Sequence, residues 1–223
     1  MSPTSTDATT DASTDLGTAA TAPAAAPSPD EVGSAAQRER RKRILDATIA
    51  LASEGGFDAV QMRSVAERAD VALGTLYRYF PSKIHLLVSA LGREFDKAEQ
   101  GLRGRPVPGE TAAERVITIL KMLSRGLQAD PHLTEALTRA FMFADSSATA
   151  EIHRVGMTMT SMLSRALHPD LVDVGELGEE DVAITKVIGD VWLSALVGWV
   201  TGRSTAADTA HQIEVAVSLL LRD

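Results

Sequence analysis

The chain has 223 residues, of which 44% are apolar, 23% are charged and 4% are aromatic, and its formal net charge is −8. A chain of this length can bury a sizeable core in one large domain or two small ones. It contains no cysteine, which excludes disulfide scaffolds, thiolate metal sites and cysteine nucleophiles. Because aliphatic residues and alanine are abundant while aromatic residues are few, the composition predicts an all-α protein.

The charge is distributed unevenly along the chain. Residues 1–30 contain four acids and no base, residues 31–90 contain nine bases and seven acids, and residues 91–223 contain thirteen bases and nineteen acids. A cationic segment therefore lies between two acidic ones. A local basic patch, rather than the total charge, is what meets a phosphate backbone.

Residues 1–33 are rich in Ser, Thr, Ala, Pro and Asp and lack periodic apolar positions. They cannot bury enough surface to offset chain entropy, so we predict a disordered acidic tail. The tail differs from a secretory signal because its first 30 residues contain no Lys or Arg and no apolar stretch. We find no apolar run of about 18 residues, the length of a membrane span, and therefore expect a cytoplasmic protein with no membrane partner.

Hydrophobic spacing predicts nine helices and no strand. The first helix covers residues 35–54 and ends at a Gly pair, and two short helices follow over residues 61–69 and 73–80. A fourth helix begins near Lys83 after a Ser82 cap and continues to about residue 100. The last five are expected at residues 111–129, 132–143, from Ser146 or Ser147 to 168, 179–202 and 205–221.

The strongest functional signal lies in residues 61–80, where two short helices flank a three-residue connection. This is the organisation of a helix-turn-helix, whose second helix enters the major groove of DNA. Leu76 and Phe80 are four residues apart and can seat the second short helix on Val65 and Ala69. The segment is therefore predicted to bind double-stranded DNA.

Side chains of residues 73–83 are expected to face the DNA. Gly74 removes a side chain where backbone and DNA can approach closely. The hydroxyl groups of Thr75, Tyr77 and Tyr79 can donate to phosphate oxygens. Lys83 lies at a predicted helix N-terminus, where the helix dipole and its ammonium group together attract an anion.

The run from Arg38 to Arg43 contains five bases in six residues. Such a run is either a solvated helix face or a phosphate-binding surface. Beside a helix-turn-helix the second interpretation is favoured, and Arg38, Arg40 and Arg41 are the candidates for backbone contacts.

The stretch from Gln37 to Leu91 resembles the N-terminal domain of TetR-type repressors. It contains a Gly pair followed by an aromatic residue, a second helix with an arginine, and the sequence GTLYRYFPSK. The resemblance implies a DNA-binding domain over residues 34–82, and a helical effector-binding and dimerisation domain over residues 83–223.

The resemblance also implies roles for single positions. Arg63 takes the place of the base-reading arginine of the second helix. The places that meet base edges or phosphates are taken by Leu73, Gly74 and Thr75, and the phosphate-clamping places by Tyr77, Tyr79 and Lys83. Leu73 departs from the polar residue common in the family, which suggests readout of a thymine methyl group.

Within the family, the segments 86–95, 133–145 and 187–194 are similar to the actinobacterial repressors of cholesterol catabolism. This closer resemblance implies a homodimeric repressor of sterol or related lipid catabolism genes that binds a palindromic operator. It also implies that a sterol-derived acid or its coenzyme A thioester is the effector. A different apolar effector, such as a fatty acyl-CoA or a drug, is the alternative within the family.

The C-terminal half is rich in methionine and apolar residues, which suit either an ordinary helical core or a pocket for a large apolar ligand. The resemblance favours the pocket, and its candidate residues are Met122, Phe141, Met142, Met159, Met162, Trp192 and Leu196. Two stripes on the last two helices predict either a dimer interface or internal packing: Val187, Val191, Ser194, Ala195, Gly198 and Thr201-Gly202, then Val215, Leu219 and Leu220.

Two other classes of function compete with an effector-controlled repressor. An enzyme is disfavoured because the five histidines are scattered and no phosphate-cradling glycine loop or metal-ligand spacing occurs. We therefore predict no catalytic residue, metal or cofactor. A ligand-independent architectural DNA-binding protein would instead have a C-terminal half packed without a cavity.

Overall fold

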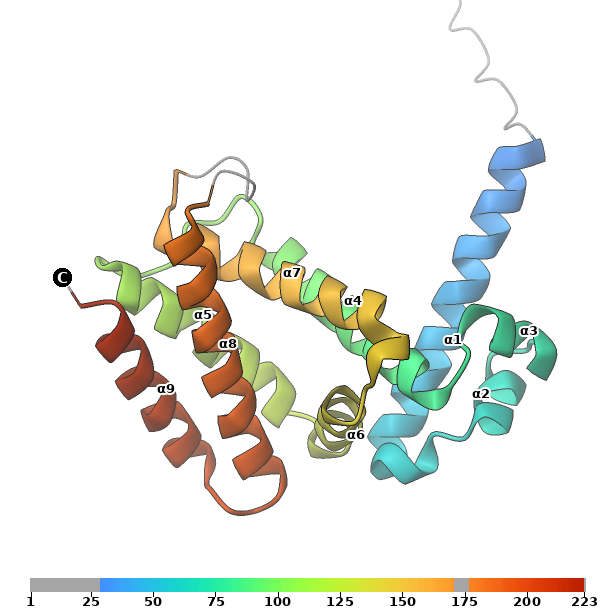
Figure 1. Cartoon of the computed structure of the whole chain (residues 1–223). Coiled ribbons are helices and arrows are strands. Elements are labelled where there is room, and N and C mark those ends of the chain that lie inside the picture. The colour runs from blue at the N-terminus through green and yellow to red at the C-terminus, as the bar shows by residue number, and fades with distance from the viewer. Residues whose placement is uncertain (1–28, 171–176, 223) are drawn as a thin grey trace, which may run out of the picture.

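The computed structural model describes residues 29–170 and 177–222, which form nine α-helices, one short 3-10 helix and no strand (Figure 1). The helices are α1 Pro29–Ala59, α2 Met62–Arg68, α3 Leu73–Tyr79, α4 Lys83–Leu102, α5 Ala112–Gln128, α6 Pro131–Met142, η1 Ser146–Ala148, α7 Thr149–Leu167, α8 Glu179–Val200 and α9 Ala206–Leu220. The predicted all-α class is confirmed.

Helix α1 begins earlier than predicted. It starts at Pro29, so residues 29–33, which we expected to belong to a disordered tail, are helical. Proline is favoured in the first helical turn, because its missing backbone N–H group would have no intrahelical partner there. The rest of the predicted tail, residues 1–28, lies outside the described residues.

The Gly pair interrupts α1 as predicted, although one further helical turn follows it. Gly55 and Gly56 have non-helical backbone angles, and Gly56 has φ 68°. A Cβ atom on Gly56 would lie 2.6 Å from Oε2 of Glu135 on α6. Gly56 therefore allows both a left-handed bend and a close approach of α1 to α6.

Side-chain caps fix the ends of most later helices. Ser82 caps α4, as predicted, by accepting from the backbone N–H of His85. Thr111 with Glu114, and Thr205 with Asp208, form complete capping boxes at α5 and α9. These caps place helix boundaries within one or two residues of those expected from the sequence.

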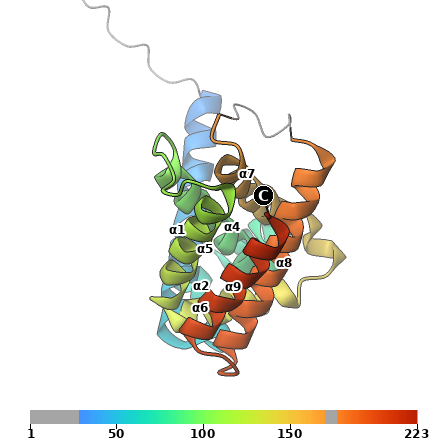
Figure 2. The ribbon, with the colours of Figure 1, turned by 90° about the vertical axis from the view of Figure 1, so that its left-hand side faces the viewer.

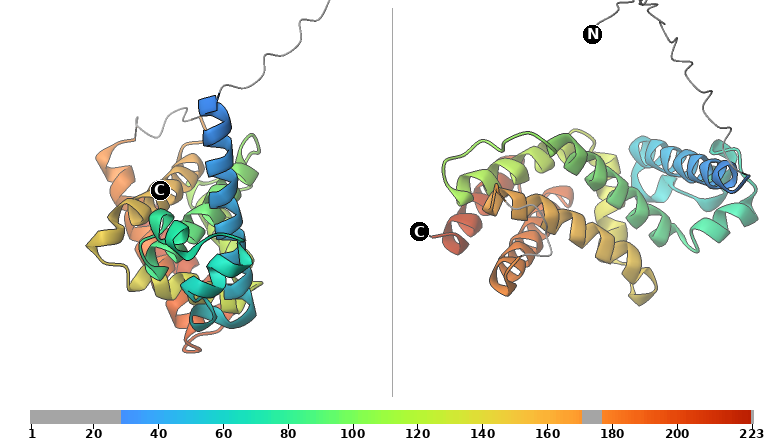
Figure 3. Two further views of the ribbon diagram at one scale, coloured as in Figure 1. Left: turned by 90° about the vertical axis from the view of Figure 1, so that its right-hand side faces the viewer. Right: turned by 90° about the horizontal axis from the view of Figure 1, so that it is seen from above.

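The helices form an elongated molecule with two functional ends. Helices α1–α3 lie at one end and the antiparallel pair α8 and α9 at the other (Figure 1, Figure 2). Seen from above, α4 runs from the α1–α3 end toward the other helices (Figure 3). Helix α4 packs against α1, α6 and α7, so it connects the two ends.

One continuous hydrophobic core joins these parts. Its fully buried side chains include Leu76 on α3 and Phe80 directly after it, Leu86 and Leu87 on α4, and Leu163 on α7. Displacement of α4 therefore cannot leave the packing of α1–α3 unchanged, because interiors are close-packed.

Helix α8 corrects one expectation from the sequence. By length and composition alone it could cross a membrane, since it has 22 residues and an 18-residue window of mean hydropathy 1.4. The window is 28% buried, and the helix packs against α6, α7 and α9 while carrying an ion pair between Lys186 and Asp190. Core and interface helices of soluble proteins pass the same test, so this is weak evidence for a membrane span.

Candidate DNA-binding surface and effector cavity

Helices α2 and α3 form the predicted helix-turn-helix. Val65, Leu76 and Phe80 are fully buried and Ala69 is 3% exposed, so the side chains that the spacing predicted to be inward are in the core. Arg43 on α1 donates to the carbonyl oxygen of Ala69 at a distance of 3.0 Å, which ties the end of α2 to α1. The run of bases did not indicate this role of Arg43, its last member.

The two short helices present a polar surface. Arg63, Gly74 and Tyr77 are exposed, whereas Leu73 and Thr75 are half-buried. Nothing lies within 4 Å of the position that a Cβ atom on Gly74 would occupy, so the backbone is open to a close approach. Arg78 on α3 is also exposed, and its charge beside Tyr77 is a signal that the sequence analysis overlooked.

The other predicted DNA-binding side chains have contacts of their own within the protein. Tyr79 is half-buried, and its ring centroid lies 6.4 Å from that of Phe80. The Nζ atom of Lys83 lies 3.8 Å from the centroid of Phe57, and burial lowers the pKa of Lys83 below its usual value. Both retain partial exposure, and their predicted contacts with phosphate stay predictions.

The bases of α1 divide between solvent and the protein surface facing α7. Arg38 is exposed and Arg40 half-buried. The Cζ atom of Arg41 lies 4.7 Å from the centroid of Phe80. Burial, followed by repulsion from Arg154, lowers the pKa of Arg41. Arg38 and Arg41 therefore border a groove beside α7, a placement that the run of bases did not predict.

A cluster around Phe57 joins the end of α1 to α6. The backbone N–H of Phe57 donates to Oε2 of Glu135 at 2.7 Å. Arg139, one turn later on α6, lies with Cζ 4.4 Å from the centroid of the Phe57 ring and forms a 3.5 Å ion pair with Asp58. These contacts tie α6 to the C-terminal end of α1.

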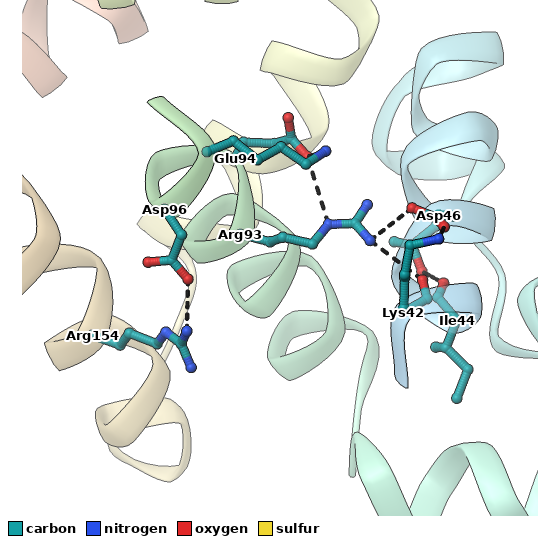
Figure 4. A network of polar contacts seen from close by, with 9 residues as sticks. Lys42, Ile44, Asp46, Arg93, Glu94, Asp96 and Arg154 are labelled. Atoms are coloured by element: carbon teal, nitrogen blue, oxygen red, sulfur yellow. Dashed lines mark hydrogen bonds and ion pairs between the residues drawn. The ribbon is translucent and has the colours of Figure 1, made fainter. Parts of the chain in front are cut away.

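Ion pairs also join α4 to its neighbours (Figure 4). Arg93 on α4 bonds to Asp46 on α1 at 2.7 Å, and Arg154 on α7 bonds to Asp96 on α4 at 2.6 Å. His85 adds a third link, because its Nε2 lies 3.0 Å from the carbonyl oxygen of Ser147. Since a carbonyl oxygen only accepts, Nε2 carries the proton.

A cavity of about 420 Å³ lies between α4, α6, α7 and α8. This volume falls within the range of about 300–1,000 Å³ that is typical of small-molecule sites. Of the predicted residues, Phe141, Met159, Trp192 and Leu196 line it. Leu91 and Phe95 contribute the α4 wall.

Three predicted pocket residues do not line this cavity. Met142 is 52% exposed at the end of α6, and Met122 is half-buried on α5. Met162 is 1% exposed and borders a separate cavity near the α4–α5 loop. Helical spacing identified the apolar side chains but could not determine which neighbouring helix each one faces.

Polar groups at this cavity were missed by the sequence analysis. His153 on α7 and the paired Lys186 and Asp190 on α8 line it and are all exposed. The signal in the sequence was Lys186, a single base within the mainly apolar helix α8. Trp192 forms part of the wall and donates from its indole N–H to Ser124 on α5 at 2.9 Å, so this donor is already satisfied.

Helices α8 and α9 carry an exposed apolar face. Val187 on α8, and Val215, Leu219 and Leu220 on α9, are each at least 38% exposed, whereas the exposed Val182 lines the cavity. Ala195, predicted for this face, is instead 1% exposed inside the core. An apolar surface of this kind marks a protein contact in many soluble proteins.

Comparison with known proteins identifies this arrangement. The family described as "Bacterial regulatory proteins, tetR family" matches residues 44–90, and "Tetracyclin repressor-like, C-terminal domain" matches residues 109–220. The chain belongs to the TetR family. Its TetR-family DNA-binding domain coincides with the helix-turn-helix, and its C-terminal domain contains the cavity.

Curated TetR-family relatives match almost the whole chain. The HTH-type transcriptional repressor KstR of Rhodococcus jostii is 57% identical over 194 residues, which cover 87% of this chain and 88% of the relative. KstR of Mycobacterium tuberculosis is 53% identical over 193 residues, covering 86% of each chain. These relatives are transcriptional repressors by name.

Solved TetR-family structures agree with the fold. A TetR transcriptional regulator from Rhodococcus sp. RHA1 superposes with a TM-score of 0.77 at 31% identity, over 84% of this chain and 98% of that chain. FadR of Thermus thermophilus in complex with lauroyl-CoA superposes with a TM-score of 0.64 at 20% identity, over 81% and 93%. The protein is thus a DNA-binding transcriptional regulator of this family.

Proposed function

We propose that the protein represses genes of sterol or related lipid catabolism and leaves its operator when it binds the coenzyme A thioester of a sterol-derived acid. The effector cavity is the observation that carries this proposal. Its wall is formed by Leu91, Phe95, Phe141 and other apolar side chains, which suit a large apolar body. Its exposed edge carries Lys186 and His153, which suit a polar or anionic head group.

The relatives support the sterol class of effector. The chain is 53–57% identical to KstR repressors, and its sequence resembles the repressors of cholesterol catabolism. FadR from Thermus thermophilus, which has a related fold, was solved in complex with lauroyl-CoA. A fatty acyl-CoA is therefore the runner-up effector. The cavity argues against a ligand-independent DNA-binding protein.

Two elements connect the cavity to the DNA-binding helices. Helix α4 lines the cavity with Leu91 and Phe95 and begins at Lys83, directly after α3. Helix α6 lines it with Phe141 and binds the end of α1 through Glu135. An effector that moves α4 and α6 apart should change the relative position of paired recognition helices. By linkage, the factor by which the effector weakens DNA binding is also the factor by which the effector prefers free repressor to DNA-bound repressor.

The exposed α8–α9 face is the proposed homodimer contact. A dimer places two recognition helices about 34–36 Å apart, one turn of DNA, and so reads a palindromic operator. Its partners are then DNA, an apolar effector and a second copy of the chain. We place this function in the cytoplasm, and it requires no catalytic residue, metal or cofactor.

We expect base readout to depend on Arg63 and Thr75. Replacing either residue with alanine should weaken binding to the selected operator by about 1–3 kcal/mol, the cost of one good base contact. Operators would be selected from random duplexes, and affinity measured by fluorescence anisotropy. Arg125→Ala, which removes an exposed base from α5, is the control. Unchanged operator affinity in Arg63→Ala would remove that residue from the site.

Intrinsic fluorescence tests the proposed effector directly. The chain has two tryptophans, and Trp192 lines the cavity whereas Trp199 does not. In a Trp199→Phe variant, a sterol-acid CoA thioester should change the emission of Trp192 at lower concentration than lauroyl-CoA does. Free coenzyme A is the control. Stronger binding of lauroyl-CoA would favour the runner-up, and no saturable change with either thioester would refute the proposed effector class.

A further inference from the structure

A second, polar groove lies between α1, α4 and α7. It has a volume of about 400 Å³ and shares no lining residue with the effector cavity. On α4, Gly92 and Asp96 border the groove, whereas the neighbouring Leu91 and Phe95 border the cavity. The two spaces therefore lie on different faces of α4.

Positive charge predominates in the groove. Its charged lining residues are Arg38, Arg41, Lys42, Arg93, Arg154, Asp96 and Glu151. Arg154 is paired with Asp96. Arg93 pairs with Asp46 at 2.7 Å and with Glu94 at 3.7 Å, and Lys42 shares Asp46 at 3.5 Å (Figure 4). Five bases and two acids line the groove, and this excess of positive charge leaves it attractive to an anion.

Arg41 stacks on Phe80 and is attracted by the charge of Glu151, whereas the hydroxyl group of Ser89 is unpaired within the described residues. Among the described side chains, Arg41 forms no salt bridge with a carboxylate, and its pKa is lowered by burial and then by repulsion from Arg154. The hydroxyl group of Ser89, which is 9% exposed, has no hydrogen-bond partner in the described part of the chain. An unpaired buried hydroxyl is costly unless a ligand completes it.

We propose that this groove binds a small molecule carrying two adjacent phosphate groups, with Arg41 and Arg154 holding the phosphates and Ser89 donating to one of them. Guanidinium groups pair with phosphate oxygens through two parallel N–H donors, which favours phosphate at a site with several arginines. The groove volume suits a small organic molecule rather than a single ion. The phosphates belong either to a free diphosphate compound or to the coenzyme A portion of a thioester.

Occupancy would connect the two ends of the protein. Arg41 belongs to α1 of the DNA-binding domain, whereas Ser89 and Arg154 belong to α4 and α7, which also line the effector cavity. A ligand that bonds to all three elements should resist their separation. It should therefore stabilise the folded protein by mass action.

Inorganic pyrophosphate is the first probe, used with the full chain at constant ionic strength. Calorimetry should show saturable binding that raises the melting temperature, and Arg41→Ala and Arg154→Ala should each weaken it tenfold or more. Arg125→Ala, outside the groove, should bind like the original protein. Ser89→Ala should weaken binding without lowering the melting temperature of the unliganded protein, because the hydroxyl is unpaired there.

Two substitutions at Gly92 distinguish a loss of binding from a loss of folding. A Cβ atom there would lie 3.7 Å from Cγ2 of Val155 and 4.0 Å from Cδ of Arg154, both ordinary contacts. Gly92→Ala should therefore fold and bind pyrophosphate, whereas Gly92→Asp should fold and lose binding because its carboxylate neutralises the arginines.

Competition identifies the source of the phosphates. If free coenzyme A displaces pyrophosphate, the groove takes the phosphates of coenzyme A; if both bind together, it takes a separate diphosphate compound. Either result supports the site. The proposal is wrong if pyrophosphate has no saturable effect beyond that of chloride, or if Arg125→Ala loses as much affinity. It is also wrong if Arg41→Ala and Arg154→Ala alter only the affinity for DNA.

Discussion

Replacing Val215 and Leu219 with glutamate should convert the protein to a monomer and lower its operator affinity by about 100-fold or more. Both side chains are exposed on α9, by 44% and 54%. Four carboxylates would enter the proposed dimer contact, where desolvation makes charges costly. A monomer then loses the gain of about 10²–10⁴ that comes from linking two half-site contacts.

Phe143→Glu is the matched control for this double variant. Phe143 is 74% exposed just after α6 and belongs to neither α8 nor α9. Light scattering after size-exclusion chromatography should give a dimer for the control and a monomer for the double variant. Anisotropy should show loss of operator affinity only in the latter. A double variant that keeps the dimer mass would place the contact elsewhere.

Gly156→Leu should block the effector while preserving DNA binding. Gly156 lines the cavity, and nothing lies within 4 Å of an added Cβ atom. A leucine side chain there would compete with the ligand, and overpacking costs about 1–3 kcal/mol, equivalent to roughly 5- to 150-fold in affinity. Operator affinity should remain close to that of the original protein, because no residue of α2 or α3 lines the cavity.

Gly126→Leu supplies the control for this substitution. Gly126 is also helical and exposed, with open space at its Cβ position, but it lies on α5 outside the cavity. Both substitutions remove a helix glycine and should stabilise the fold by roughly 0.5–1 kcal/mol. Equal thioester affinity in the two variants would show that the effector binds outside this cavity.

The sequence predicted the helices well because their signals are local. Apolar periodicity, the Ser82 cap and the Gly pair at the end of the first helix all act over a few residues. The seat of α3 on Val65 and Ala69 was also predictable, because it needs only two short helices and one spacing. The early start of α1 was missed because the composition of residues 29–33 resembles that of the preceding tail.

The cavity was less predictable because it depends on how helices face each other. Met159 and Met162 lie on one helix, yet the first lines the effector cavity and the second lines another space. The polar residues His153, Lys186 and Asp190 come from two helices that only the fold brings together. The placement of Arg41 beside Phe80 and α7 likewise requires three segments that are distant in sequence.

Operator release by the effector is the most direct test of this account. A labelled duplex carrying the selected operator would be saturated with the dimer and titrated with a sterol-acid CoA thioester, with free coenzyme A in parallel. The account predicts that anisotropy falls to that of free DNA over the concentration range in which Trp192 reports binding. Anisotropy that stays constant while Trp192 reports saturation would contradict it, because the cavity and the DNA-binding surface would then not be coupled.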